Sequence, residues 1–238
     1  MNILRQAIRA VETLILFAFF GIGAVLLAPA ALFLRDVRYC TFMIRMAWMP
    51  FVRLFEIAGL IKIDISRLMD IRGSVIAANH PSLIDVVILI AVIPRTLFVA
   101  KHGLKKNPFV SVLVKNASLP DDESLVKVAG KYLKDGWNVL IFPEGTRSPD
   151  GGGLQQFRRG AAQLAIRTGS PLVPVAIRLS PFRILGKHQQ PWDMGSEKVT
   201  YEFIARSPIK IETVEGEPLH GMAKRVTEKL RDDIVALL

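Results

Sequence analysis

The feature that most constrains this chain is a long apolar run near its N-terminus. No charged residue occurs between Leu14 and Leu34. As an α-helix, these 21 residues would reach roughly 30 Å, about the thickness of the hydrocarbon core of a bilayer. A second helical segment, from Val37 to Leu60, carries four charged side chains among apolar residues and is amphipathic. The sequence therefore predicts an N-terminal helical segment that associates with a membrane.

The sequence leaves the geometry of this membrane contact open. Basic residues flank the apolar run on both sides, so the positive-inside rule gives no single orientation for a span. A helical hairpin that dips into one leaflet fits at least as well. A cleaved secretory signal fits less well, because the run is too long for a signal-peptide core and Pro29 is followed by more hydrophobic residues. A buried helical hairpin is the remaining alternative.

After residue 62, short apolar runs alternate with helical patterns. This alternation predicts an α/β fold with a largely parallel central sheet flanked by helices. The length of 238 residues accommodates one such domain and a short appendage. We expect a membrane-associated helical segment over residues 1–62 and a catalytic domain over residues 63–238. The expected strands are 74–78, 97–100, 138–142, 172–177 and 199–205, and the helical patterns are 83–93, 123–135, 159–168 and 217–237.

The charge of the chain predicts an acidic partner. The formal net charge is +10 and the sequence pI is near 10.0, which fits nucleic acid, anionic lipid headgroups or an acidic carrier protein. The apolar N-terminus favours lipid, and no recognised nucleic-acid-binding motif is present. Cys40 is the only cysteine, which excludes a disulfide framework and suits a reducing compartment. We expect the protein at the cytoplasmic face of a membrane, the inner membrane in a bacterium.

Polar clusters follow three of the expected strands. They are Asn-His-Pro-Ser-Leu-Ile-Asp at 79–85, Lys-His-Gly-Leu at 101–104 and Pro-Glu-Gly-Thr-Arg-Ser at 143–148. Open α/β sheets bind ligands beyond the carboxyl ends of their strands. We therefore expect the three clusters to converge on one crevice.

The spacing of His80 and Asp85 indicates a catalytic pair. In one continuous helix, residues five apart would point roughly 140° away from each other. Pro81 disfavours the helical conformation for His80 and is itself suited to a first helical turn, so Asp85 can fold back towards an extended His80. A carboxylate on one ring nitrogen leaves the other free to take a proton from a hydroxyl. His80 is the predicted general base and Asp85 its partner.

No serine or cysteine nucleophile is needed for this chemistry. The chain has no Gly-x-Ser-x-Gly motif, and Cys40 lies in the amphipathic segment. Direct attack by an acceptor hydroxyl is therefore preferred over an acyl-enzyme, with general-base catalysis contributing roughly 10²- to 10⁴-fold. The other histidines, His102, His188 and His220, lack metal-ligand spacing, so no metal site is expected.

Two motifs together resemble the signatures of a known family. Asn79-His80-x4-Asp85 and the segment Phe142–Ser148 look like the motifs of the glycerolipid acyltransferases, typified by 1-acyl-glycerol-3-phosphate acyltransferases. The resemblance covers about residues 70–180. It implies a thioester donor, either acyl-CoA or acyl carrier protein, a membrane-lipid acceptor, and neither metal nor cofactor. The residues expected to bind substrate are Asn79, Lys101, Glu144, Gly145, Thr146 and Arg147.

Some of these residues have alternative interpretations. Arg147 either binds a lipid phosphate with its planar fork or forms an ion pair with Glu144 that holds the loop. Lys101 is either a site residue or an ordinary surface cation. Arg158 and Arg159 are expected on a solvated or lipid-headgroup face rather than in direct contact with substrate.

The chain departs from the family pattern at one place that bears on the acceptor. Members that act on lysophosphatidate usually carry a phosphate-binding arginine after the second strand cluster, whereas residues 114–122 contain none and end in Asp121 and Asp122. We therefore expect a membrane-associated O-acyltransferase for a lysophospholipid-like acceptor. This acceptor is either a lysophospholipid with a larger headgroup or the glycolipid-like or lipid-anchor end of a specialised bacterial lipid. Lysophosphatidate itself is the first alternative. A thioester or lipid hydrolase and a non-catalytic membrane lipid-binding protein are alternatives of other classes.

Overall fold

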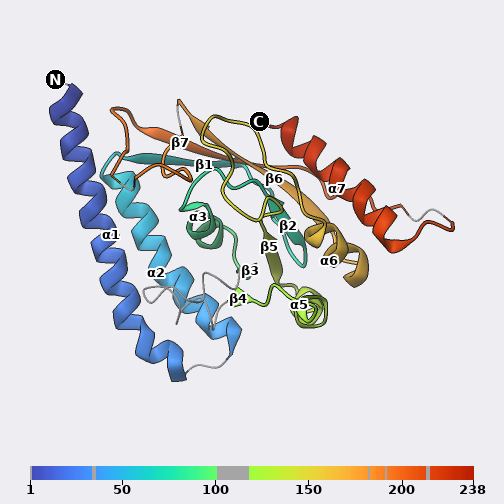
Figure 1. Ribbon diagram of the computed structural model, residues 1–238. Coiled ribbons are helices and arrows are strands. Elements are labelled where there is room, and N and C mark those ends of the chain that lie inside the picture. The colour runs from blue at the N-terminus through green and yellow to red at the C-terminus, as the bar shows by residue number, and fades with distance from the viewer. Residues whose placement is uncertain (1, 34–35, 101–117, 182, 191, 213–214) are drawn as a thin grey trace.

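The computed structural model describes residues 2–33, 36–100, 118–181, 183–190, 192–212 and 215–238. Side chains are described for all of these except residues 2, 24–25 and 27–33. The described chain forms a central sheet with helices on both faces, as Figure 1 shows. The predicted α/β class is confirmed.

Seven strands form the sheet within the described residues, in the order β1-β7-β6-β2-β5-β3-β4. Neighbouring strands are parallel except β6 and β7, so the sheet is largely parallel as predicted. The helices are α1 (Asn2–Phe33), α2 (Val37–Ile57), α3 (Asp85–Val92), α5 (Leu125–Lys134), α6 (Gly160–Thr168) and α7 (Leu219–Val235). The strands are β1 (Ile61–Arg67), β2 (Val75–Ala78), β3 (Thr96–Val99), β4 (Ser118–Leu119), β5 (Asn138–Ile141), β6 (Leu172–Ser180) and β7 (Val199–Ala205).

The two faces of the sheet carry separate hydrophobic clusters. Along β2, Ile76 and Ala78 pack in a cluster with α2 and α3, whereas Val75 and Ala77 pack in a cluster with α5, α6 and α7. This division follows from the alternation of side chains along a strand. All four residues are completely buried, so β2 reads as a continuous apolar run, as is typical of a strand covered on both faces. The carboxyl end of β2 is thereby fixed in the centre of the fold (Figure 1).

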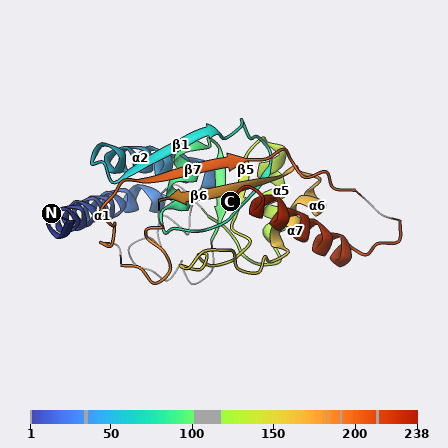
Figure 2. The same ribbon diagram turned by 90° about the horizontal axis from the view of Figure 1, so that it is seen from above.

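The predicted N-terminal helical hairpin is present as α1 and α2, which lie side by side (Figures 1 and 2). Phe17 of α1 packs edge-on against Phe51 and Phe55 of α2, at centroid distances of 6.0 and 5.9 Å. Arg9 also ties α1 to the domain, since its guanidinium donates to the carbonyl oxygens of Gly59, Leu60 and Glu197. The hairpin is therefore an integral part of the fold.

The outer side of the α1–α2 hairpin exposes large hydrophobic side chains. The hairpin is therefore not buried in the core of this chain, which was the alternative left open by the sequence. Within the described part of the chain, neither α1 nor any other helix has the combination of length and apolarity that a membrane span requires. The exposed large hydrophobic side chains of α1 and α2 are Ile3, Leu4, Ile8, Val11, Leu14, Ile15, Phe19, Ile22, Leu26, Tyr39, Phe42, Met46, Met49 and Ile57.

Candidate active site

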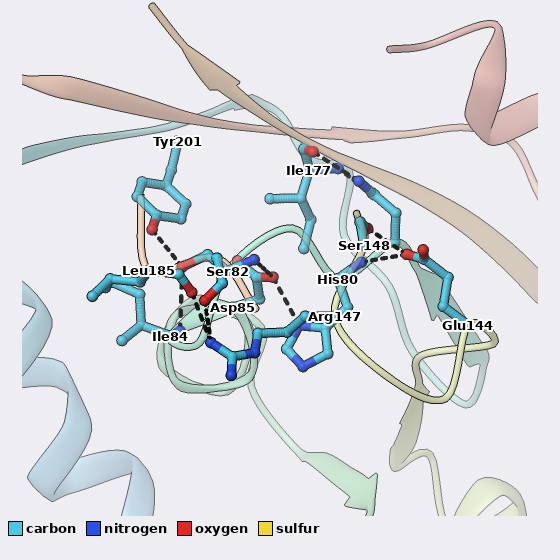
Figure 3. A network of polar contacts seen from close by, with 12 residues as sticks. His80, Ser82, Ile84, Asp85, Glu144, Arg147, Ser148, Ile177, Leu185 and Tyr201 are labelled. Carbon is cyan, nitrogen blue, oxygen red and sulfur yellow. Dashed lines mark hydrogen bonds and ion pairs between the residues drawn. The ribbon is translucent and has the colours of Figure 1, made fainter. Parts of the chain in front are cut away.

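His80 and Asp85 lie at the carboxyl end of β2 and at the start of α3. His80 precedes Pro81 in the extended connection, and Asp85 is the first residue of α3. The Nδ1 atom of His80 lies 2.9 Å from Oδ2 of Asp85. Figure 3 marks this contact with a dashed line. The contact predicted from the sequence spacing is confirmed, for the reason given there: the proline keeps His80 out of the helix.

The surroundings of Asp85 determine how the imidazole is held. The carboxyl group is completely buried, which raises the pKa of Asp85, while the hydrogen bond from His80 acts in the opposite direction. The backbone N–H of Ser82 also donates to Oδ2, at 2.7 Å. A carboxylate in this position accepts from Nδ1–H of His80 and fixes that tautomer. The Nε2 atom is then the acceptor nitrogen of the ring.

The ring of His80 is positioned from a second side by Phe142. The two rings stack with centroids 4.2 Å apart and an interplanar angle of 19°. The His80 side chain retains 19% exposure, and its Nε2 atom has no hydrogen bond within the described part of the chain. The imidazole is therefore held rigidly at one nitrogen and is accessible at the other.

Glu144 connects the two signature segments. Its carboxylate is almost completely buried and accepts from the backbone N–H of His80 at 2.9 Å, the hydroxyl of Ser148 at 2.6 Å and the backbone N–H of Gln155 at 2.7 Å. A further bond runs from Ser148 N to the carbonyl oxygen of His80, at 2.7 Å. Glu144 therefore fixes the loop after β5 against the backbone of His80.

The guanidinium of Arg147 donates hydrogen bonds to backbone carbonyl groups. It donates to the carbonyl oxygens of Leu185 at 3.1 Å, Gly186 at 2.5 Å and Lys187 at 3.3 Å. The alternative of an Arg147–Glu144 ion pair is wrong, because the Glu144 carboxylate is held by His80, Ser148 and Gln155 instead. Arg147 clamps the segment 185–187 onto the signature loop.

Gly145 allows an arginine to approach this loop. Its φ is +64°, and a Cβ atom at this position would lie 2.9 Å from Nε of Arg158. The backbone N–H of Arg158 donates to the carbonyl oxygen of Pro143 at 2.8 Å, so the arginine is anchored beside the loop. A glycine is therefore required both for the backbone conformation and for the space that Arg158 occupies.

A polar pocket of about 460 Å³ lies beside the signature loop that contains Glu144. Neither Arg158 nor Arg159 forms an ion pair within the described residues. The sequence predicted a solvated or lipid-headgroup face for these two arginines; both are exposed, and both also line the pocket. His80 does not line the pocket but is joined to it by the hydrogen bond to Glu144. The lining residues are Glu144, Thr146, Gln155, Gln156, Phe157, Arg158 and Arg159.

Comparison with known proteins assigns the chain to a family. The family model described as Acyltransferase matches residues 61–178, a segment that contains both signature motifs. The chain belongs to the acyltransferase family. This confirms the resemblance drawn from His80, Asp85 and the segment 142–148.

The sequence similarity to individual members covers about half of the chain, whereas the similarity in fold covers all of it. The chain is 31% identical over 128 residues to a chloroplastic 1-acyl-sn-glycerol-3-phosphate acyltransferase of Brassica napus, covering 49% of this chain and 37% of the relative. It is 34% identical over 115 residues to a 1-acyl-sn-glycerol-3-phosphate acyltransferase of Neisseria meningitidis, covering 45% and 44%. The chain thus spans less than half the length of either relative. The crystal structure of the 1-acyl-sn-glycerophosphate (LPA) acyltransferase of Thermotoga maritima has a TM-score of 0.67 at 22% identity, covering 100% of this chain and 98% of that one.

The side chain of Asn79 has a structural role, because it forms hydrogen bonds with the backbone of β6. Asn79 was expected to bind substrate, but its side chain is completely buried. Its amide donates to the carbonyl oxygen of Ile177 at 2.9 Å and accepts from the Ile177 N–H at 2.7 Å. These bonds continue the β2–β6 ladder beyond Ala78, so the side chain faces the sheet rather than a ligand. The expectation of direct substrate contact is corrected accordingly.

Two other residues expected to bind substrate are Thr146 and Lys101. Thr146 lines the pocket, as expected for an acceptor-binding residue. Lys101 and residues 114–117 lie outside the described residues. Gln155 and Gln156 also line the pocket and were missed by sequence reasoning, because glutamines in a loop carry no distinctive spacing.

Proposed function

We propose that this protein is a membrane-associated O-acyltransferase that moves a fatty acyl group from acyl-CoA or acyl carrier protein to the hydroxyl of a lysophospholipid acceptor. The single observation that carries the proposal is the His80–Asp85 pair at 2.9 Å, with the second ring nitrogen accessible. Family membership supports the same chemistry.

The reaction follows from this geometry in two steps. The acceptor hydroxyl oxygen attacks the thioester carbonyl carbon, a C–O bond forms, and the hydroxyl proton passes to Nε2 of His80. Asp85 stabilises the resulting imidazolium through Nδ1. The tetrahedral intermediate then collapses, the C–S bond breaks, and the imidazolium returns the proton to the departing thiolate. The products are the acylated lipid and the free thiol, and His80 is regenerated.

The pocket beside the pair supports an acceptor that carries a phosphate. Arginine guanidinium groups match phosphate oxygens in geometry and charge. Arg158 and Arg159 have no carboxylate partner within the described residues, whereas the Glu144 carboxylate is held by three donors. We assign the headgroup phosphate to these two arginines, with Arg147 holding the neighbouring loop.

Two types of lysophospholipid are candidates for the acceptor. The relatives named as 1-acyl-sn-glycerol-3-phosphate acyltransferases favour lysophosphatidate. The absence of an arginine in residues 114–122 favours a larger headgroup with a phosphodiester. A panel of acceptors offered with one acyl donor decides between them, because the ratio of kcat/KM values measures discrimination. If kcat/KM for lysophosphatidate is at least about tenfold higher than for every other acceptor, a lysophospholipid with a larger headgroup is not the preferred acceptor.

Membrane association is supported by the exposed apolar side of α1 and α2 and by the net charge of +10. We place the site at the cytoplasmic face, where anionic headgroups attract a basic protein.

The experiment that separates a transferase from a hydrolase measures thioester loss with and without an acceptor. We expect free thiol to appear only when a lysophospholipid is added, in equal amount to the acylated lipid. Thioester loss at the same rate without an acceptor contradicts transfer and indicates a hydrolase.

A further inference from the structure

Tyr201 is a buried polar side chain that the proposed mechanism does not use. It lies on β7, is completely buried, and its hydroxyl oxygen lies 2.7 Å from Oγ of Ser82. Burial, together with the charge of Asp85, raises the pKa of Tyr201 well above its usual value, so the hydroxyl stays neutral. β7 follows the segment 61–178 that the family model matches.

Ser82 connects this hydroxyl to the catalytic pair. The backbone N–H of Ser82 donates to Oδ2 of Asp85 at 2.7 Å, and the same oxygen is the partner of His80 Nδ1. The backbone N–H of Ile84 also approaches Oγ of Ser82, at 3.4 Å. Ser82 therefore bonds Tyr201 on one side and Asp85 on the other, as Figure 3 shows.

The position of Tyr201 in the sheet makes it a rigid support. It pairs with Ile63 on β1 and with Leu179 on β6, so its backbone is held from both sides. Its ring stacks on that of Phe203, with an interplanar angle of 17°. The hydroxyl is thus delivered to Ser82 from a strand in the interior of the sheet.

We propose that Tyr201 is a positioning residue of the acyl-transfer site, which acts through Ser82 to hold Asp85, and hence the imidazole of His80, in the orientation for proton transfer. The proposal rests on the proposed function of His80. Tyr201 itself touches neither substrate nor reacting atoms. Because it acts on the base rather than on the acceptor pocket, its loss lowers kcat and leaves KM unchanged.

The test compares two tyrosine variants in the full chain. In Tyr201→Phe we expect kcat to fall about three- to tenfold, as for loss of one buried hydrogen bond, with KM within about twofold of the wild type. The control is Tyr132→Phe, because Tyr132 lies on α5, partly buried against the hydrophobic cluster on the opposite face of the sheet from His80. The control variant is expected to keep the kcat and the KM of the wild type.

A pH–rate profile adds a readout that a merely structural role does not move. The ionisable groups around Asp85 are His80, Glu144 and Tyr201. A less firmly held carboxylate stabilises the imidazolium of His80 less. The ascending limb of kcat against pH therefore moves to lower pH in Tyr201→Phe.

A double-mutant cycle with Ser82→Ala tests the connection itself. Both single variants remove the same hydrogen bond, so Tyr201→Phe combined with Ser82→Ala should be no slower than Ser82→Ala alone. If Tyr201→Phe does not fold, Ser82→Ala decides in its place. A wild-type kcat in the deciding variant, or a change confined to KM, overturns the proposal. Absence of transfer in the wild type, or full transfer by His80→Ala, instead refutes the proposed function.

Discussion

Replacement of Gly145 by alanine separates two effects that the structure places at one residue. The first is backbone strain, because φ is +64°. An L-residue in the left-handed region costs about 1–2 kcal/mol, which in a chain of this size lowers Tm by about 2–8 °C. The second is steric, because the new Cβ would lie 2.9 Å from Nε of Arg158 and the Arg158 side chain must shift from its present position at the pocket.

Gly169→Ala is a matched control for the first effect alone. Gly169 has a φ of +66°, almost that of Gly145, and no heavy atom within 4 Å of the position of a Cβ. We expect both variants to lose similar stability in thermal unfolding. Only Gly145→Ala should raise KM for a phosphate-bearing acceptor, by about threefold or more, as expected for a weakened charged hydrogen bond. An unchanged KM in Gly145→Ala, or an equal rise in KM in Gly169→Ala, refutes the proposal that Arg158 binds the acceptor phosphate.

Three further variants test the other parts of the site. Arg158→Ala should raise KM for the acceptor about tenfold with little change in kcat, whereas Arg167→Ala, on the exposed side of α6, should change neither in steady-state assays. Asp85→Asn should lower kcat by about 10²- to 10⁴-fold. Because burial raises the pKa of Asp85 in the folded state, the free energy of unfolding of the wild type should fall as pH rises through that pKa. Chemical denaturation at several pH values should show no such fall for Asp85→Asn. Ile15→Asp, on the exposed side of α1, should weaken binding to anionic vesicles at least tenfold in flotation assays, whereas Val235→Asp on α7 should not; equal binding by both variants contradicts a membrane role for the hairpin.

Much of the fold was predictable because the apolar runs and helical patterns are local signals. The largely parallel direction of the central strands and the α1–α2 hairpin follow from these patterns. Strand β1 was missed, although Ile61, Ile63 and Ile65 alternate with polar residues, because the preceding amphipathic helix was extended through Leu60. The reversal of β7 was not predictable, since a strand's pattern does not reveal its direction.

The contact between His80 and Asp85 was predictable from the sequence, whereas the contacts of Arg147 and Tyr201 were not. Pro81 makes the His80–Asp85 contact a matter of local conformation. For Arg147 the sequence left a phosphate and an ion pair with Glu144 open, and neither indicated its contacts with carbonyl groups 38 to 40 residues away, in a segment without any sequence signal. Tyr201 likewise reaches Ser82 across 119 residues. Long-range contacts of this kind depend on strand order, which the sequence pattern does not specify.

In the proposed reaction, His80 removes the proton from the acceptor hydroxyl. The most direct test of this step measures acyl transfer from a thioester to a lysophospholipid by purified His80→Ala, beside wild type and His220→Ala, a histidine on the exposed side of α7. We predict that His80→Ala keeps the wild-type melting behaviour and loses at least about 10²-fold in kcat, whereas His220→Ala keeps full activity. A folded His80→Ala enzyme that transfers acyl groups at the wild-type rate contradicts the account.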